Sequence, residues 1–261
     1  MDALILQDRL PDAPWRESSF RRLPGMRAIG PDDWVFVDGA YRAQMRLRED
    51  LLAARRDDVL AVLPEAVPAA DEVLELALDV LVRRPEFDVT AGAVLRPDGR
   101  AVAIARDDPL GTVGRILQED VCILEKQGDE HVLTGAVLVF PSGWTLAQKL
   151  GRPLLRIHRP VAEYDGDVGR RVQRLFDGLK VGRPLMRSNL LWHGEPMLFA
   201  PRTEENPRDP EAEMPPYLRS ERQCLVRLPR TGAVIFTIHT TVMATAALSP
   251  EDRAALTHRP D

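Results

Sequence analysis

Apolar residues recur at helical spacing in three stretches of the chain. The first covers residues 38–54, with Asp38 at its start as a possible N-terminal cap. The second covers residues 70–83 and stops before Pro85, and the third covers residues 165–180. Each pattern predicts an amphipathic helix with one buried face.

Short β-like runs replace the helical spacing after residue 90. Three pairs of runs flank polar, glycine-containing turns, which is the pattern of β-hairpins, and the turns lie at residues 97–99, 127–130 and 229–232. The helices come first and there is no regular strand–helix–strand alternation. This order predicts an α+β fold with an antiparallel sheet flanked by helices and disfavours a doubly wound parallel sheet.

The order of these elements also predicts the domain organisation. We expect residues 1–90 to form an N-terminal arm and helices packed on the core, and residues 91–248 to form the core itself. Residues 249–261 would be a C-terminal tail, so that the whole chain makes one compact domain.

Composition excludes several classes of protein. The 261 residues carry 35 basic and 40 acidic side chains, a balance that argues against binding to nucleic acid or to an anionic membrane. No apolar run approaches a membrane span, and the N-terminus lacks the features of a signal peptide, so we expect a soluble, cytoplasmic protein. Two cysteines are too few for a four-cysteine iron–sulfur site, and the glycine-rich motifs that bind nucleotides are missing.

The five histidines divide into two groups. We expect His131, in a hairpin turn, and His258, in the tail, to be solvated. The other three, His158, His193 and His239, lie beside apolar segments. A histidine in such surroundings can bind a haem iron, or it can be a core residue hydrogen-bonded to a carbonyl group, which is the more common case.

Two charged segments precede predicted strands. In Gln118-Glu119-Asp120, alternation along a strand would direct one carboxylate to a cavity and the other to solvent, unless this is an ordinary loop end. In residues 218–223, Arg219 and Arg222 flank a glutamate just before the last hairpin. These arginines could bind carboxylates such as haem propionates, or form surface salt bridges.

Several segments match one known family in the same order along the chain. They are residues 25–26, 33–41, 117–120, 140–144, 149–154, 157–161, 187–189, 221–223 and 228–238. The block from 140 to 161 is long and composed of unlike residues in a fixed order. The chain resembles the haem-dependent oxidative N-demethylase family, of the haem-binding α-subunit type.

This resemblance implies a PAS-like fold for residues 91–248, with haem b held in its cavity and helices flanking the antiparallel sheet. The implied activity is oxidative demethylation of a small secondary amine such as dimethylamine, with O₂ as oxidant. Electrons would come from NADPH through partner subunits that carry FMN and a [2Fe–2S] cluster. Three positions depart from the family pattern, because Ala162, Leu190 and Thr240-Thr241 stand where the family usually has proline, tryptophan and tyrosine. The substrate pocket is therefore expected to differ.

The resemblance also implies an iron ligand. The step from Ile157 through His158 to Pro160 matches the family pattern, which makes His158 the expected proximal ligand. His239 is the second choice as ligand and is a candidate for a catalytic role on the distal side.

The remaining site residues follow from the same resemblance. Lys149, Arg219 and Arg222 are the expected partners of the haem propionates. Glu119 or Asp120 is expected to hold the amine, because a buried carboxylate can bind an ammonium ion and later accept its proton.

Two other functions fit the same residues. A haem protein with a PAS fold can sense a gas or a redox state without turnover, since a fold alone does not separate sensing from catalysis. A haem-free binding protein, in which His158 is only structural, is the third possibility.

Overall fold

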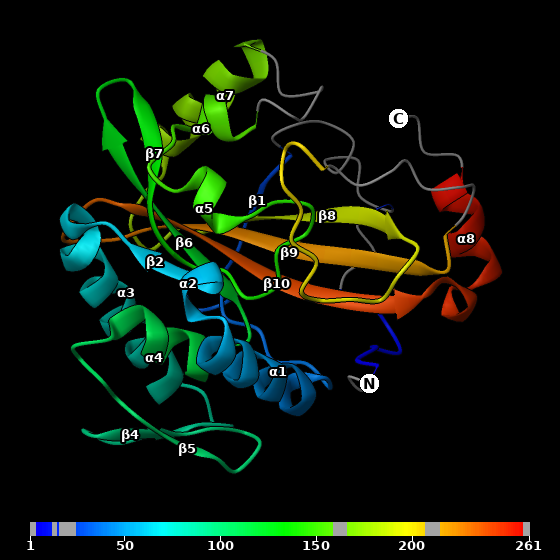
Figure 1. Cartoon of the computed structure of the whole chain (residues 1–261), viewed down its shortest axis with the longest axis horizontal. Helices are drawn as coiled ribbons and strands as arrows, with labels where there is room; N and C mark the ends of the chain where they lie inside the picture. The colour runs from blue at the N-terminus through cyan, green and yellow to red at the C-terminus, as the bar shows by residue number, and fades with distance from the viewer. Residues whose placement is uncertain (1–3, 12–14, 16–24, 159–165, 207–214, 258–261) are drawn as a thin grey trace.

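A seven-stranded sheet forms the centre of the computed structural model, which describes residues 4–11, 15, 25–158, 166–206 and 215–257 (Figure 1). Every pairing in this sheet is antiparallel. In spatial order its strands are β1 (Arg27–Ala28), β8 (Leu185–His193), β9 (Tyr217–Arg227), β10 (Val234–Ala244), β6 (Asp120–Gln127), β7 (Glu130–Val137) and β2 (Leu60–Val62).

The helices and a second, small sheet surround this centre. The α-helices are α1 (Tyr41–Ala54), α2 (Arg56–Val59), α3 (Val67–Val82), α4 (Pro109–Ile116), α5 (Leu146–Lys149), α6 (Leu154–Ile157), α7 (Gly166–Gly178) and α8 (Pro250–Thr257). The 3₁₀ turns are η3 (Pro64–Ala66) and η4 (Thr245–Ala247). The small sheet contains β3 (Asp88–Val89), β4 (Ala93–Leu95) and β5 (Ala101–Ala103).

One face of the large sheet packs against α1, α3 and α4, and we call it the α1 face (Figure 1). Val121 of β6, Ile235 of β10 and Cys224 of β9 point to this side. They belong to one buried apolar cluster with Met45 of α1 and Leu74 of α3. The burial of these helix stripes supplies the main hydrophobic contribution to this layer.

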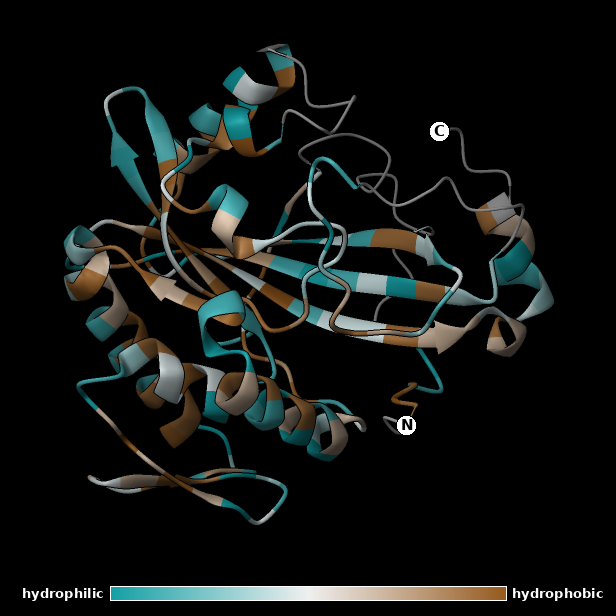
Figure 2. Ribbon diagram, viewed as in Figure 1, coloured by the Kyte–Doolittle hydropathy of each residue, from teal (hydrophilic) through white to brown (hydrophobic). Residues whose placement is uncertain are grey.

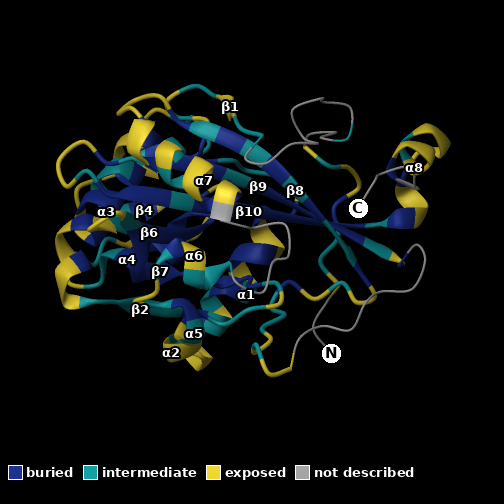
Figure 3. Cartoon of the chain, turned by 90° about the horizontal axis from the view of Figure 1, so that it is seen from above, coloured by how far each residue is buried: buried dark blue, intermediate teal, exposed yellow. Residues whose placement is uncertain are grey.

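The opposite face packs against α5, α6 and α7, and we call it the α6 face (Figure 1). Leu225 of β9 and Ile238 of β10 point to it. They form a separate buried cluster with Leu146 of α5, Leu154 of α6 and Phe176 of α7. Because successive side chains alternate along a strand, each strand contributes to both clusters. Strands β6, β9 and β10 are largely buried, whereas α7 and α8 expose their outer sides (Figure 3).

The predicted helices and hairpins are present. Helices α1, α3 and α7 cover the three stretches with helical spacing, and α1 begins after Ala40 rather than at Asp38. The three hairpins are β4–β5, β6–β7 and β9–β10. Gly99, Gly128 and Gly232 adopt positive φ angles in their turns, which only glycine adopts without strain. The α+β class with a large antiparallel sheet is confirmed.

The structure also contains elements that the pattern did not predict. Strand β8 was missed because polar residues interrupt its apolar ones, and α4 was missed because Gly111 and Gly114 weaken its helical pattern. Residues 218–223 were expected to precede a strand, but they lie inside β9, where hydrophilic residues run along the half of the sheet that leads to α8 (Figure 2). Tertiary packing overrides local propensity at these places.

The expected exposure of His131 was wrong. Its side chain is buried, its Nδ1 lies 2.9 Å from Oε1 of Gln173, and its ring contacts that of Phe176 at 5.0 Å between centroids. The helix α7 covers the hairpin end that the sequence left open. His258, the other histidine expected to be solvated, lies outside the described residues.

No helix in the described ranges combines the length and the hydropathy needed to cross a lipid bilayer.

Candidate functional site

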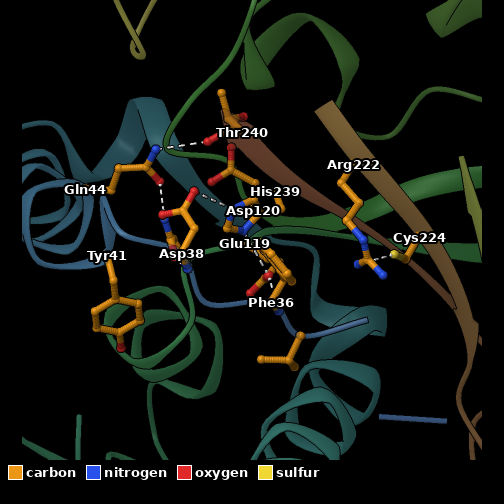
Figure 4. A network of polar contacts seen from close by, with 12 residues as sticks. Phe36, Asp38, Tyr41, Gln44, Glu119, Asp120, Arg222, Cys224, His239 and Thr240 are labelled. Carbon is orange, nitrogen blue, oxygen red and sulfur yellow. Dashed lines mark hydrogen bonds and ion pairs between the residues drawn. The ribbon is translucent and has the colours of Figure 1, made fainter. Parts of the chain in front are cut away.

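His239 lies between two carboxylates on the α1 face (Figure 4). Its Nδ1 donates to Oε1 of Glu119 and its Nε2 donates to Oδ2 of Asp38, each over 3.2 Å. The ring of Phe36 meets the imidazole edge-on, with centroids 5.0 Å apart. The sequence named Glu119 and His239 as catalytic candidates, and the fold brings these two into contact.

Asp38 joins this contact to the N-terminal part of the chain. Besides His239, its carboxylate accepts hydrogen bonds from Gln7 at 2.8 Å, Gln118 at 2.8 Å and the backbone N–H of Ala40 at 2.9 Å. Asp38 was expected to cap α1, but it instead satisfies these four donors. It therefore ties the segment before α1 to the central strand β10.

The protonation states follow from this geometry. Burial alone would lower the pKa of His239, but the hydrogen bonds to Asp38 and Glu119 and their charges raise it to about 9. Burial would raise the pKa of Asp38, but its bonds to His239, Gln118 and Gln7 lower it to about 2. At neutral pH His239 is thus an imidazolium that donates from both nitrogens. With both nitrogens donating to carboxylates, neither offers a lone pair to a metal ion in this arrangement.

The two oxygens of Glu119 differ. Oε1 accepts from His239 and, at 2.7 Å, from the backbone N–H of Phe36. Oε2 is buried and has no hydrogen-bond partner among the described residues. Oε2 is therefore the acceptor position of this group that the fold leaves uncommitted.

Asp120 is fully engaged within the protein. It forms an ion pair with Arg48 at 2.6 Å and accepts from the backbone N–H groups of Val139 and Phe140, both at 2.8 Å. The expectation that one carboxylate of the acidic step faces solvent was wrong, because Glu119 and Asp120 are both buried. Asp120 joins α1 to the end of the β6–β7 hairpin.

His158 occupies the C-terminal end of α6. Its Nδ1 donates to the backbone carbonyl of Leu154 at 2.9 Å, one helical turn earlier. Burial lowers the pKa of His158 and the charge of Lys149 lowers it further, against the opposing effect of the Leu154 bond. The imidazole is therefore neutral at pH 7, with its proton on Nδ1 and its lone pair on Nε2. This is the tautomer that haem iron requires, and a carbonyl partner for Nδ1–H is typical of metal-binding histidines.

A comparison with known protein families matches most of the chain. A family model described as haem-dependent oxidative N-demethylase, alpha subunit-like, matches residues 25–259. The chain belongs to this family. The matched region contains all the helices and strands named above, so the family match covers the whole described fold.

Lys149 was expected to bind a haem propionate, but its side chain contacts the C-terminal end of α6. Its Nζ donates to the backbone carbonyl of Ile157 at 2.6 Å and to Oε1 of Glu204 at 3.2 Å. Arg156 binds both oxygens of the same glutamate, at 2.9 and 3.0 Å. The Lys149 side chain is buried. It thus holds the residue that directly precedes His158.

Arg219 and Arg222, the other expected propionate partners, lie on different faces of the sheet. Arg219 is buried and donates to Glu221, to the carbonyl groups of Leu198 and Phe140, and to Oγ1 of Thr240.

Arg222 lies on the α1 face, directly across from His239 in the β9–β10 register. Its Nη1 donates to Sγ of Cys224 at 3.2 Å, and its guanidinium lies 5.7 Å from the ring centroid of Phe36. Both arginines are buried, whereas the alternative reading placed them on the surface.

The sheet separates the two candidate histidines. Ile238 packs in the α6-face cluster with Leu154, and therefore its neighbour His239 points to the α1 face. His158 follows the helix that covers the α6 face (Figure 1). Glu119 and His239 are thus in contact with each other but not on the side of His158.

The matched segments also become spatial neighbours. Residues 187–189 of β8 pair with residues 221–223 of β9 across the centre of the sheet. Residues 159–161 of the matched block, and Ala162 after them, lie outside the described residues. His193, the third histidine beside an apolar segment, is buried in β8 with Nε2 at 3.2 Å from Oγ of Ser142.

Sequence reasoning missed Asp38 and Gln118 as members of the His239 group. The available signal was the cluster of polar residues in otherwise apolar surroundings, but Asp38 fitted a helix cap equally well. Among the described residues, no set of three or more histidines, cysteines or acidic side chains could bind a metal ion directly.

Proposed function

We propose that this protein is the haem-binding subunit of an oxidative N-demethylase that acts on a small secondary amine such as dimethylamine with O₂. Partner subunits carrying FMN and a [2Fe–2S] cluster would deliver electrons from NADPH. Membership of the demethylase-like family supports the reaction class. The small amine, the partners and a PAS-like topology are parts of the proposal.

The observation that carries the proposal is the state of His158. A buried helix end, the Leu154 carbonyl and the nearby Lys149 together favour a neutral imidazole with its lone pair on Nε2. These features fit the axial ligand of haem b, and we assign that role to His158. Bound haem would supply the O₂ and electron-transfer chemistry.

The α6 face offers suitable surroundings for such a group. Leu185 and Phe236 pack at the edge of its apolar cluster and are only partly buried, although they lie in inner strands of the sheet. Gln223 and Arg187, a cross-strand pair, are also only partly buried. Partly buried apolar side chains beside polar groups suit a porphyrin and its carboxylates.

The site residues on the two faces of the sheet have separate tasks in this proposal. Lys149 holds the α6 end through the Ile157 carbonyl and keeps His158 neutral by its charge. On the α1 face, hydrogen bonds join Asp38, His239 and Glu119, and these bonds fix the N-terminal segment against β10. The proposal therefore gives Glu119, Asp120 and His239 no contact with the haem.

The test is the absorption spectrum of the full chain expressed with a haem precursor. In the His158→Gln variant we expect loss of the Soret band of bound haem, with unchanged far-ultraviolet circular dichroism. Added imidazole should restore part of the band by replacing the ligand. His131→Gln is the matched control, because it removes another buried histidine of the same region, and it should keep its haem.

Three results would count against the proposal. Full haem occupancy with an unchanged spectrum in His158→Gln would refute the ligand assignment. A wild-type protein without any Soret band would refute the haem function. A Soret band that ignores dimethylamine and other small amines would favour a sensor of gas or redox state.

A further inference from the structure

A row of polar side chains crosses the α6 face in the middle of the sheet. Arg219, Glu221 and Gln223 follow one another at every second position of β9, and Leu225, next in the same series, packs in the cluster beneath α6. The β9 pairings on both sides run without a shift, so all four side chains share this face. Inner strands covered on both faces are normally apolar, which makes the row unusual.

Glu221 occupies the centre of this row. It is directly opposite Asn189 on β8 and Thr240 on β10. Its Oε1 accepts from Nε of Arg219 at 3.0 Å and its Oε2 accepts from Nε2 of Gln223 at 3.1 Å. The carboxylate is thus held at both oxygens, and its side chain is about nine-tenths buried.

The negative charge on this part of the α6 face comes from a single residue. In β8, β9 and β10, all within the described ranges, Glu221 is the only acidic residue. The guanidinium of Arg219 also donates to the carbonyl groups of Leu198 and Phe140, which share its positive charge. Burying an ion pair in a sheet costs desolvation energy that an apolar pair of similar size would avoid. Such a pair is therefore better explained by a ligand than by stability.

We propose that Glu221 binds the ammonium group of the substrate, a task that the sequence assigned to Glu119 or Asp120. This inference rests on the proposed function. Glu221 lies on the same face as His158, whereas Glu119 points to the opposite face and Asp120 is saturated by Arg48 and backbone N–H groups.

The chemistry of a secondary amine matches this carboxylate. A dialkylammonium ion carries one positive charge and two N–H donors. Among the described residues, Oε1 of Glu221 accepts from Arg219 and Oε2 accepts from Gln223, and a carboxylate oxygen has two acceptor positions. Both donors of the ligand can therefore be satisfied, whereas a quaternary ammonium ion offers none. The site should bind dimethylamine more tightly than tetramethylammonium.

The test is a titration of the haem-loaded full chain with dimethylamine, followed by the shift of the Soret band. In Glu221→Gln we expect haem content to be unchanged and the apparent Kd to rise about tenfold to hundredfold, as for loss of a charge-assisted hydrogen bond. Glu125→Gln is the matched control, because Glu125 lies on β6 and accepts from Thr134. Its Kd should stay at the wild-type value.

A Glu221→Gln variant that binds haem and titrates like wild type would overturn the inference. If that variant does not fold, Glu221→Asp decides, because it keeps the charge but withdraws the carboxylate by one methylene. A weaker Kd at full haem content supports the inference, and an unchanged Kd overturns it. If neither variant folds, the wild type decides: equal affinity for dimethylamine and tetramethylammonium overturns the inference, and preference for dimethylamine supports it.

This design separates the two proposals. A wild-type chain without haem, or without any amine response, contradicts the proposed function itself. A wild-type chain that responds, together with an indifferent Glu221→Gln variant, contradicts only the role of Glu221.

Discussion

The imidazolium of His239 should make the stability of this protein depend on pH in a defined window. In the folded state the ring lies between Asp38 and Glu119, and these partners raise its pKa to about 9. In the unfolded chain a histidine has a pKa of about 6.5. The substitution His239→Gln removes the titrating group while keeping a neutral side chain whose amide nitrogen can still donate hydrogen bonds.

The sign and size of the effect follow from linkage. Because the folded-state pKa is the higher one, the stabilisation is fully present below pH 6.5 and is lost as the pH rises through about 9. The two values differ by roughly 2.5, and one pKa unit corresponds to about 1.4 kcal/mol, so the loss is about 3 kcal/mol. The low pKa of Asp38 reflects the same contact and adds nothing to this figure.

The assay is urea unfolding at a series of pH values between about 6 and 9.5, followed by tryptophan fluorescence. Other groups bracket this window. Burial lowers the pKa of His131 and of His158, so their contributions change mainly below about pH 6.5, in both proteins alike, and cancel in their difference. Burial raises the pKa of the Cys122 thiol, which lowers stability above about pH 8.5 in both proteins and cancels in their difference.

We expect the wild-type free energy of unfolding to exceed that of His239→Gln most at pH 6, and the difference to shrink by about 3 kcal/mol toward pH 9.5. A difference that stays constant across this range would refute the reasoning. So would a wild-type protein that gains stability relative to the variant as the pH rises.

Three further predictions concern the packing around the site. Asp120→Asn should lower the free energy of unfolding by about 3–5 kcal/mol, because it leaves the buried Arg48 without its counter-charge; a loss below about 1 kcal/mol in urea unfolding would contradict this. Gly114→Ala should cost about 1–3 kcal/mol in the same assay, because the added Cβ would lie 2.6 Å from a methyl group of Val137, and an unchanged midpoint would contradict the packing of α4. Lys149→Met should raise the pKa of His158, because the charge of Lys149 lowers it in the wild type. As the pH falls, the Soret band should therefore be lost at a higher pH in the variant than in wild type. An unchanged or lower midpoint would count against this role of Lys149.

Local pattern was sufficient for the helices and hairpins. Helices α1, α3 and α7 were predictable because each buries one stripe of a regular 3.6-residue repeat. The hairpins were predictable because each turn combines polar residues with a glycine that adopts a positive φ angle. Strand β8 was not, since its alternating polar residues become interpretable only when β9 lies beside it.

The sequence by itself determined the fold class, the family and the chemical types available at the site. Motifs in a fixed order identify the family, and the family model confirms it. They also named Glu119, His158 and His239 as residues of interest. The spacing of these residues along the chain contains no information about which of them face one another, because contacts between such distant positions form only when strands pair.

Only the tertiary structure decided how these residues are grouped. Pairing of β9 with β10 directs His239 to the α1 face, where Asp38 and Glu119 meet it, while His158 follows α6 on the other side. The same register places Glu221 on the α6 face. Since side chains alternate along a strand, a change of one residue in register would exchange the two faces. The register of the central strands therefore separates the buried imidazolium group from the face proposed to bind haem and amine.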